Sequence, residues 1–85
     1  MPEISRFLGI IIYMYAKDHE PPHFHAHYQG FRSSWTIHDL KMTVGELLPR
    51  IERLVKEWAL SRREELIDNW AECKNGKQPR KLSPL

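Results

Sequence analysis

Residues 23–28 read His-Phe-His-Ala-His-Tyr, in which histidines alternate with apolar or aromatic side chains. Side chains of a β-strand point to opposite faces in turn, so this period of two predicts a strand. One face would carry the phenylalanine, alanine and tyrosine toward a core, and the other would carry three histidines. Gln29-Gly30 follows as a turn signal, so we expect the next run to pair back as a hairpin.

The segments on either side of this strand complete a sheet. Residues 7–15 read FLGIIIYMY, and their β-branched and aromatic side chains predict one central strand that is buried on both faces. Residues 31–38 alternate again, and residues 41–44 form a short further strand after a turn at Asp39-Leu40. The sequence therefore predicts an antiparallel sheet of three or four strands.

Beyond Gly45 the apolar period becomes helical. Pro49 suits a first helical turn, and Ser61-Arg62-Arg63-Glu64 matches a capping box, which places the start of a second helix near Ser61. A single bent helix fits the same apolar pattern, and Asn75-Gly76 ends the helical region. The apolar phase also carries large aromatic side chains that we expect in the core. These are Trp35, Trp58 and Trp70.

The order of strands before helices predicts an α+β fold, with one or two C-terminal helices packed on one face of the sheet. Residues 1–76 form the single domain in this prediction. Residues 77–85 contain two prolines and three basic side chains but no acid. We expect them to be an extended or loosely docked basic tail.

Composition narrows the class of protein. The chain has 85 residues, 41% of them apolar and 28% charged, and its formal net charge is +2. This balance is typical of a globular domain, and the charge is too small to indicate nucleic acid by itself. A lone cysteine, Cys73, excludes an internal disulfide and fits a reducing compartment. Residues 7–15 are too short to span a bilayer, so we expect a cytoplasmic protein that has no membrane partner.

Three interpretations of the histidine strand stay open at this point. His23 and His25 lie two apart on one strand face, which suits a divalent transition metal such as zinc, with His19 or His38 as a third ligand. The same pair, oriented by His19, suits metal-free acid–base catalysis by a ribonuclease-like hydrolase or transferase. The third interpretation is structural, with half-exposed histidines that hydrogen-bond to the stiff proline loop at residues 17–22 or to another chain.

Four basic residues are candidates for binding an anion or a nucleic-acid backbone. Arg32 lies on the strand next to the histidines, where a guanidinium can bind a phosphate. Lys77, Arg80 and Lys81 belong to the basic tail, where each phosphate contact would add salt-sensitive affinity. A solvated tail is the alternative for these three.

Residues 4–7 (Ile-Ser-Arg-Phe) and 19–26 (His-Glu-Pro-Pro-His-Phe-His-Ala), together with Glu57-Trp58 and Asn69-Trp70, resemble a bacterial family. It comprises the short proteins grouped as domain of unknown function 4160, and the resemblance covers almost the whole chain. The family's genes often lie beside those of another small domain of unknown function, in pairs that look like toxin–antitoxin modules. The resemblance therefore implies a small partner protein encoded nearby and a role, such as that of the toxin, in such a pair.

Taken together, the residues and the resemblance lead us to expect one component of a toxin–antitoxin-like pair that acts through its histidine strand. One alternative is a non-catalytic module that binds protein, RNA or DNA. The other is a metal-binding domain that uses His19, His23 and His25. Apolar side chains on both faces of residues 7–15 also predict association, either as a homo-oligomer or with the partner.

Overall fold

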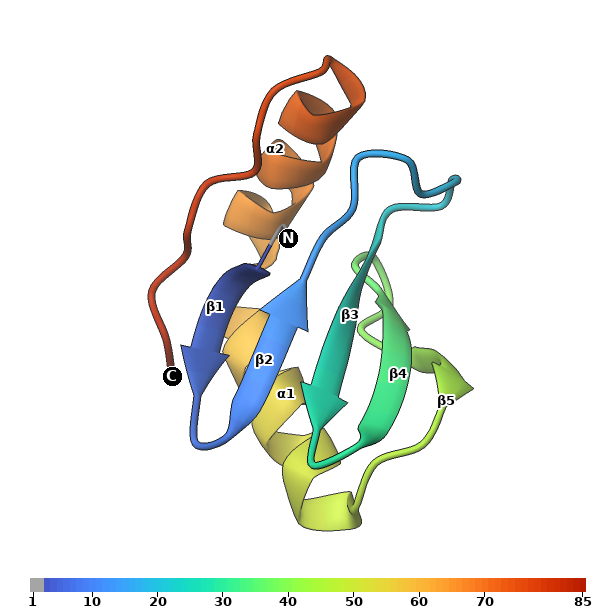
Figure 1. The fold of residues 1–85 in the computed structure, drawn as a ribbon, viewed down its shortest axis with the longest axis vertical. Coiled ribbons are helices and arrows are strands. Elements are labelled where there is room, and N and C mark those ends of the chain that lie inside the picture. Colours follow the sequence, from blue (N-terminus) through green and yellow to red (C-terminus); the bar gives the residue numbers. More distant parts are fainter. Residues whose placement is uncertain (1–2) are drawn as a thin grey trace.

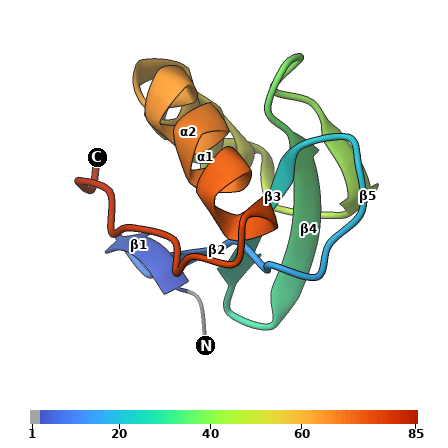
Figure 2. The same ribbon diagram turned by 90° about the horizontal axis from the view of Figure 1, so that it is seen from above.

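The computed structural model describes residues 3–85, and this part of the chain has an α+β fold with a five-stranded antiparallel sheet and two C-terminal helices (Figure 1). The strands follow one another across the sheet in chain order, and both helices lie on the same side of it (Figure 2). The elements are β1 (Glu3–Phe7), β2 (Ile10–Tyr13), β3 (His23–Tyr28), β4 (Phe31–Thr36), β5 (Met42–Gly45), α1 (Pro49–Ser61) and α2 (Arg63–Lys74).

The prediction of one strand over residues 7–15 is wrong, and this is why the sheet has more strands than expected. Leu8 and Gly9 have φ angles of 50° and 80° and form a tight turn between β1 and β2. Turns with two positive φ angles match the twist of a hairpin, and glycine adopts such angles without steric cost. The central position therefore belongs to β3 rather than to residues 7–15, and β1 lies at the edge.

The core lies between the sheet and the helices. Phe24 on β3 packs edge-on against Trp58 of α1, with ring centroids 5.9 Å apart, and stacks on Trp35 of the neighbouring strand. Trp35, Trp58 and Trp70 are exposed by only 1%, 0% and 4%, which confirms the prediction that they belong to the core. Ala26 is also fully buried, so the apolar half of β3 faces the helices as its alternation predicted.

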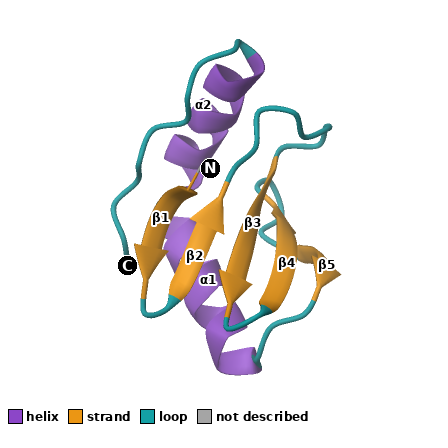
Figure 3. Ribbon diagram, in the orientation of Figure 1, coloured by secondary structure: helices purple, strands orange, loops and turns teal. Residues whose placement is uncertain are grey.

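The helical region consists of two helices that are separated at Arg62, which resolves the choice between one bent helix and two (Figure 3). The predicted capping box is wrong, because the Ser61 hydroxyl donates to the carbonyl of Trp58 instead of capping α2. Within residues 3–85, neither helix combines the length and apolarity needed to cross a bilayer.

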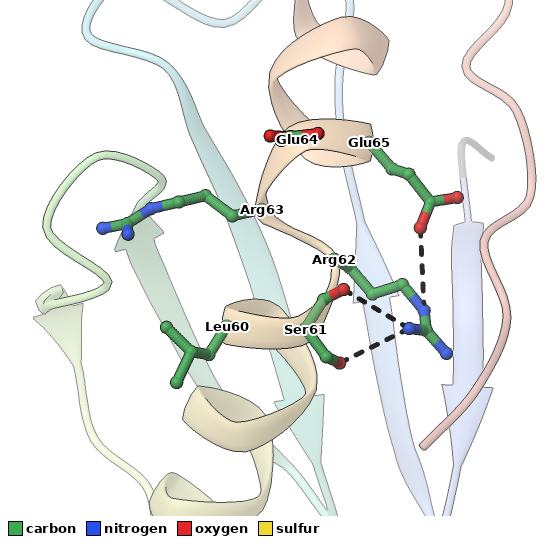
Figure 4. Close-up of a pocket in the computed structure, with 6 residues that line it drawn as sticks. All are labelled: Leu60, Ser61, Arg62, Arg63, Glu64 and Glu65. Atoms are coloured by element: carbon green, nitrogen blue, oxygen red, sulfur yellow. Dashed lines mark hydrogen bonds and ion pairs between the residues drawn. The ribbon is translucent and has the colours of Figure 1, made fainter.

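Two consecutive arginines at the helix junction hold different parts of the chain (Figure 4). Arg62 contacts Glu65 and Ser61, and its guanidinium also donates to the carbonyl of Ser83 in the tail. Arg63 points the other way and donates to the carbonyls of Ile37 and His38 in the turn before β5. The hollow of about 360 Å³ at this junction is therefore bordered by two arginines whose guanidinium groups are engaged in holding the fold.

The C-terminal tail is docked rather than loose. It runs back along β1, where the Leu82 amide donates to the carbonyl of Ile4 over 2.7 Å and the Leu82 side chain is buried. Fully buried Asn69 donates to the carbonyl of Arg80 and accepts from its amide. The Trp58 indole donates to the carbonyl of Ser83 over 2.9 Å. The tail thus covers the outer edge of β1.

Replacement of Asn69 tests this docking. In Asn69→Ala both bonds to Arg80 are lost at a buried site, so we expect the free energy of unfolding to fall by about 1–3 kcal/mol. Hydrogen exchange of the Leu82 amide should accelerate as the tail detaches. Gln78→Ala, an exposed change in the same tail, is the matched control. Unchanged exchange at Leu82 in Asn69→Ala would contradict the assignment of Asn69 as the anchor.

Candidate functional site

β3 fixes its histidines because it is paired along both edges. His25 lies opposite Tyr13 of β2 on one side and opposite Ser34 of β4 on the other. The histidines point away from the face that packs on α1, and His23, His25 and His27 are all partly exposed. We call this side of the sheet the histidine face. Its side chains are held in register by backbone pairing rather than by a flexible loop.

Asp18 joins two of these histidines from the loop between β2 and β3. Its Oδ2 atom lies 2.9 Å from Nε2 of His25 and 3.2 Å from Nε2 of His23. The two imidazole rings are close neighbours, with centroids 5.2 Å apart. One ligand atom from each of the three residues lies within 4.8 Å of the other two. We call these residues the Asp–His–His cluster.

The second nitrogen of each ring in the cluster also has a partner. Nδ1 of His23 lies 2.9 Å from the carbonyl of Pro21, which can only accept, so this nitrogen carries a hydrogen and donates it. Nδ1 of His25 lies 3.1 Å from the Ser34 hydroxyl, which can donate or accept. Both Nδ1 atoms are therefore engaged outside the cluster, and both Nε2 atoms point to the same oxygen.

α2 holds the loop that carries Asp18. The indole of Trp70 donates to Oε2 of Glu20 over 3.1 Å and lies against the ring of His23, with centroids 5.2 Å apart. The Lys74 ammonium lies over the face of Trp70 and donates to the backbone carbonyl of Asp18. The position of the carboxylate thus depends on a helix that contacts both the loop and the first histidine.

Two hollows adjoin the cluster on the histidine face. The first, of about 360 Å³, is bordered by Asp18, His23 and the loop residues after Asp18, and we call it the aspartate hollow. The second, of about 260 Å³, is bordered by His25, His27 and Arg32, and we call it the arginine hollow. Ser34 and Val44 border both hollows, so the two are neighbours on one surface.

Burial changes the titration of two groups around the arginine hollow. Partial desolvation, followed by the nearby Arg32 charge and His25, lowers the pKa of His27. Partial desolvation, followed by Tyr13 and Asp18, raises the pKa of Tyr15. Tyr15 packs edge-on against His25, with centroids 4.9 Å apart. At neutral pH the hollow therefore presents an uncharged His27 imidazole and a protonated Tyr15 hydroxyl beside the Arg32 guanidinium.

The structure brings together some of the residues that the sequence singled out. His23 and His25 are adjacent, and Arg32 lies opposite His27 in the pairing of β3 with β4. His19 is exposed. It borders the aspartate hollow but lies outside the cluster. His38 is exposed, in the turn after β4.

The basic residues of the tail lie apart from the histidine face. The tail follows the β1 edge, whereas the histidines belong to β3 at the centre of the sheet. Arg80 pairs with Glu72 over 3.2 Å, and Lys81 lies 3.9 Å from Glu3. Lys77 is exposed just beyond α2. The structure therefore does not place Lys77, Arg80 and Lys81 in one site with Arg32.

Sequence reasoning missed Asp18 and Ser34. Asp18 comes five residues before His23 and directly before His19, so a search for carboxylates as well as histidines near the His-x-His pair would have found it. Ser34 follows from the hairpin register, because a strand pairing that turns at Gln29-Gly30 places it opposite His25. The loop conformation that returns Asp18 to the strand has no comparable signal in the sequence.

Comparison with known proteins shows that the chain matches one protein family. The model of the family described as Domain of unknown function (DUF4160) matches residues 9–71, which include β2 to β5, α1 and most of α2. No curated protein and no solved structure matches the chain. The matched segment contains the whole Asp–His–His cluster and both residues shared by the hollows.

The lowered pKa of His27 makes a prediction about acid stability. Its ring should titrate below the ordinary histidine value of about 6.5 in an NMR titration of its Cε1 proton. As the pH falls through that ordinary value, the unfolded chain then binds more protons than the native state, so His27 lowers the free energy of unfolding. His27→Gln should remove this contribution. A midpoint at or above the ordinary value would contradict the desolvated environment described above.

Proposed function

We propose that this chain, which belongs to the DUF4160 family, binds a divalent transition-metal ion through Asp18, His23 and His25. The observation that supports this proposal is the convergence of both Nε2 atoms on one carboxylate oxygen. Two imidazoles and one carboxylate are an established ligand set for zinc and for non-haem iron. The proposal replaces His19, as the third ligand expected from sequence, by its neighbour Asp18.

The separations suit a common metal ion. Metal–ligand bonds of about 2.0–2.2 Å place neighbouring ligand atoms roughly 3.0–3.5 Å apart in octahedral or tetrahedral geometry. The Asp18 oxygen lies 2.9 and 3.2 Å from the two Nε2 atoms. Small side-chain movements are therefore enough to exchange these contacts for coordination.

The outer contacts of the histidines also support the proposal. Metal-ligating histidines usually donate their other ring N–H to a carbonyl, carboxylate or similar acceptor, which fixes the ring and the tautomer. Nδ1 of His23 donates to the carbonyl of Pro21, and Nδ1 of His25 faces the Ser34 hydroxyl. Both rings are thus held with Nε2 directed into the cluster.

Three protein ligands leave coordination positions for water or substrate, as catalytic rather than structural centres do. The aspartate hollow is bordered by Asp18 and His23 and the arginine hollow by His25, so each offers space for a ligand beside the cluster. A metal held there polarises a bound oxygen and lowers the pKa of bound water, so the function we propose is metal-assisted hydrolysis or transfer.

Metal binding is measured on the purified chain by calorimetry with Zn²⁺, Fe²⁺ and Mn²⁺. We expect one ion per chain. Ser34→Ala removes an outer contact of a ligand and should lower the metal affinity by roughly 10–100-fold. Asp18→Asn and His25→Ala change ligands themselves and should each lower it further. His38→Ala, an exposed histidine outside the cluster, should bind as the wild type does. Equal affinity in Asp18→Asn, with circular dichroism showing the native fold, would refute the proposal.

A second candidate function uses the same side chains without a metal. Asp18, His25 and Ser34 form a continuous hydrogen-bonded relay, with separations of 2.9 and 3.1 Å. In this arrangement His25 donates to the carboxylate through Nε2 and accepts the Ser34 proton at Nδ1, which is the relation between base and nucleophile in serine hydrolases. Labelling of Ser34 by a fluorophosphonate, retained after chelation of metals, would favour this alternative.

The expectations about partners remain predictions. They comprise a small protein encoded nearby, RNA or DNA as a ligand, self-association, a toxin role in a toxin–antitoxin-like pair, and a non-catalytic binding module as the alternative. We propose that a toxic activity, where present, acts through the cluster. Controlled expression in a bacterial host would then arrest growth with the wild type but not with His23→Ala/His25→Ala. Arrest by both proteins would place the activity elsewhere.

A further inference from the structure

The arginine hollow differs from its neighbour in charge. Among the side chains that border it, Arg32 supplies a guanidinium, Tyr15 and Ser34 supply hydroxyls, and His25 and His27 supply imidazoles. Among residues 3–85, no carboxylate borders this hollow. The aspartate hollow, by contrast, is bordered by Asp18 and Glu20. The arginine hollow therefore combines one permanent positive charge with hydroxyl and imidazole groups, beside the apolar side chain of Val44.

Arg32 is not neutralised by a neighbour. Across the described chain it takes part in no ion pair, while Arg6, Arg62 and Arg80 each contact a glutamate. It lies opposite His27 on paired strands, so its backbone is fixed at the border of the hollow. An unpaired guanidinium beside hydroxyl groups and the His27 imidazole is suited to an oxyanion, which accepts hydrogen bonds from such donors.

The hollow is also directly beside the Asp–His–His cluster. His25 belongs to both, because its Nε2 atom faces Asp18 and its ring borders the hollow. Ser34 borders both hollows. An anion bound by Arg32 therefore lies next to the residues that hold the metal in the proposed function.

We infer that the arginine hollow binds the phosphate group of a phosphate ester and presents it to the metal held by Asp18, His23 and His25. The presentation to the metal rests on the proposed function. Arginine matches phosphate with paired N–H groups, and a cation next to a metal stabilises the charge that develops in phosphoryl chemistry. The volume of about 260 Å³ is enough for a phosphate group with part of its ester.

The test compares two arginine variants of the full chain. Arg32→Gln removes the charge at the hollow, and Arg53→Gln removes an exposed arginine from α1, which packs on the opposite face of the sheet. Binding of inorganic phosphate, adenosine monophosphate and a short single-stranded RNA is measured at constant ionic strength, with and without one equivalent of Zn²⁺. The side-chain ¹⁵Nε resonance of Arg32 reports where each ligand binds.

We expect Arg32→Gln to weaken phosphate and ester binding by roughly 10–100-fold, because loss of a hydrogen bond from a charged group typically lowers affinity by that factor. Arg53→Gln should change the affinity little. Zn²⁺ should strengthen binding to the wild type. Tighter binding of the nucleotide or RNA than of inorganic phosphate identifies an ester as the ligand, and the reverse order overturns the ester assignment in favour of free phosphate.

The failures of the two proposals are distinguishable. Equal binding by wild type and Arg32→Gln, or no binding of any of these ligands, overturns the phosphate site even where calorimetry shows the metal. Arg32-dependent binding that Zn²⁺ leaves unchanged supports the phosphate site but overturns its coupling to a metal. In that case the relay of Asp18, His25 and Ser34 is the group next to the bound phosphate.

Discussion

The position of β3 at the centre of the sheet is the constraint on which both the fold and the site depend. Its backbone is paired with β2 and with β4, so the face on which each of its side chains lies cannot change without a shift of the sheet. Phe24 and Ala26 fill the core beneath α1, and His23 and His25 are thereby fixed on the other face. The alternation that buries the apolar half of β3 is the same one that aligns the histidines.

The loop from Tyr15 to Pro22 adds what the strand cannot supply. A carboxylate on β3 itself would have to replace one of the histidines, whereas the loop returns Asp18 over the strand end and lets both rings face it. α2 secures this loop, through Trp70 to Glu20 and through Lys74 to the carbonyl of Asp18. The second helix therefore serves the site as well as the core, and its separation from α1 at Arg62 places it beyond the strand ends (Figure 1).

The sequence predicted what depends on local period and missed what depends on turns and long-range contacts. The strand at residues 23–28, the helical region and the buried tryptophans all follow from apolar spacing. The turn at Leu8-Gly9 was missed because an unbroken apolar run conceals it, and only Gly9 marks it. The cluster was predicted in part, since His23 and His25 share a strand face. Asp18 joins the cluster only because of the fold of its loop, and the loop is held by contacts with α2 such as that from Lys74.

The contacts of the cluster explain how a site can be held ready before a ligand binds. Each ring nitrogen of His23 and His25 lies near a partner, and the single buried side-chain polar atom without one, among residues 3–85, is the Ser5 hydroxyl, on β1 at the far side of the sheet. The rings are thus oriented before any ligand arrives, and an oriented site loses less entropy on binding. A metal would displace the hydrogen between His25 and Asp18, so metal and proton compete for the same atoms. The interaction that stabilises the metal-free cluster is therefore also the one that a metal must replace.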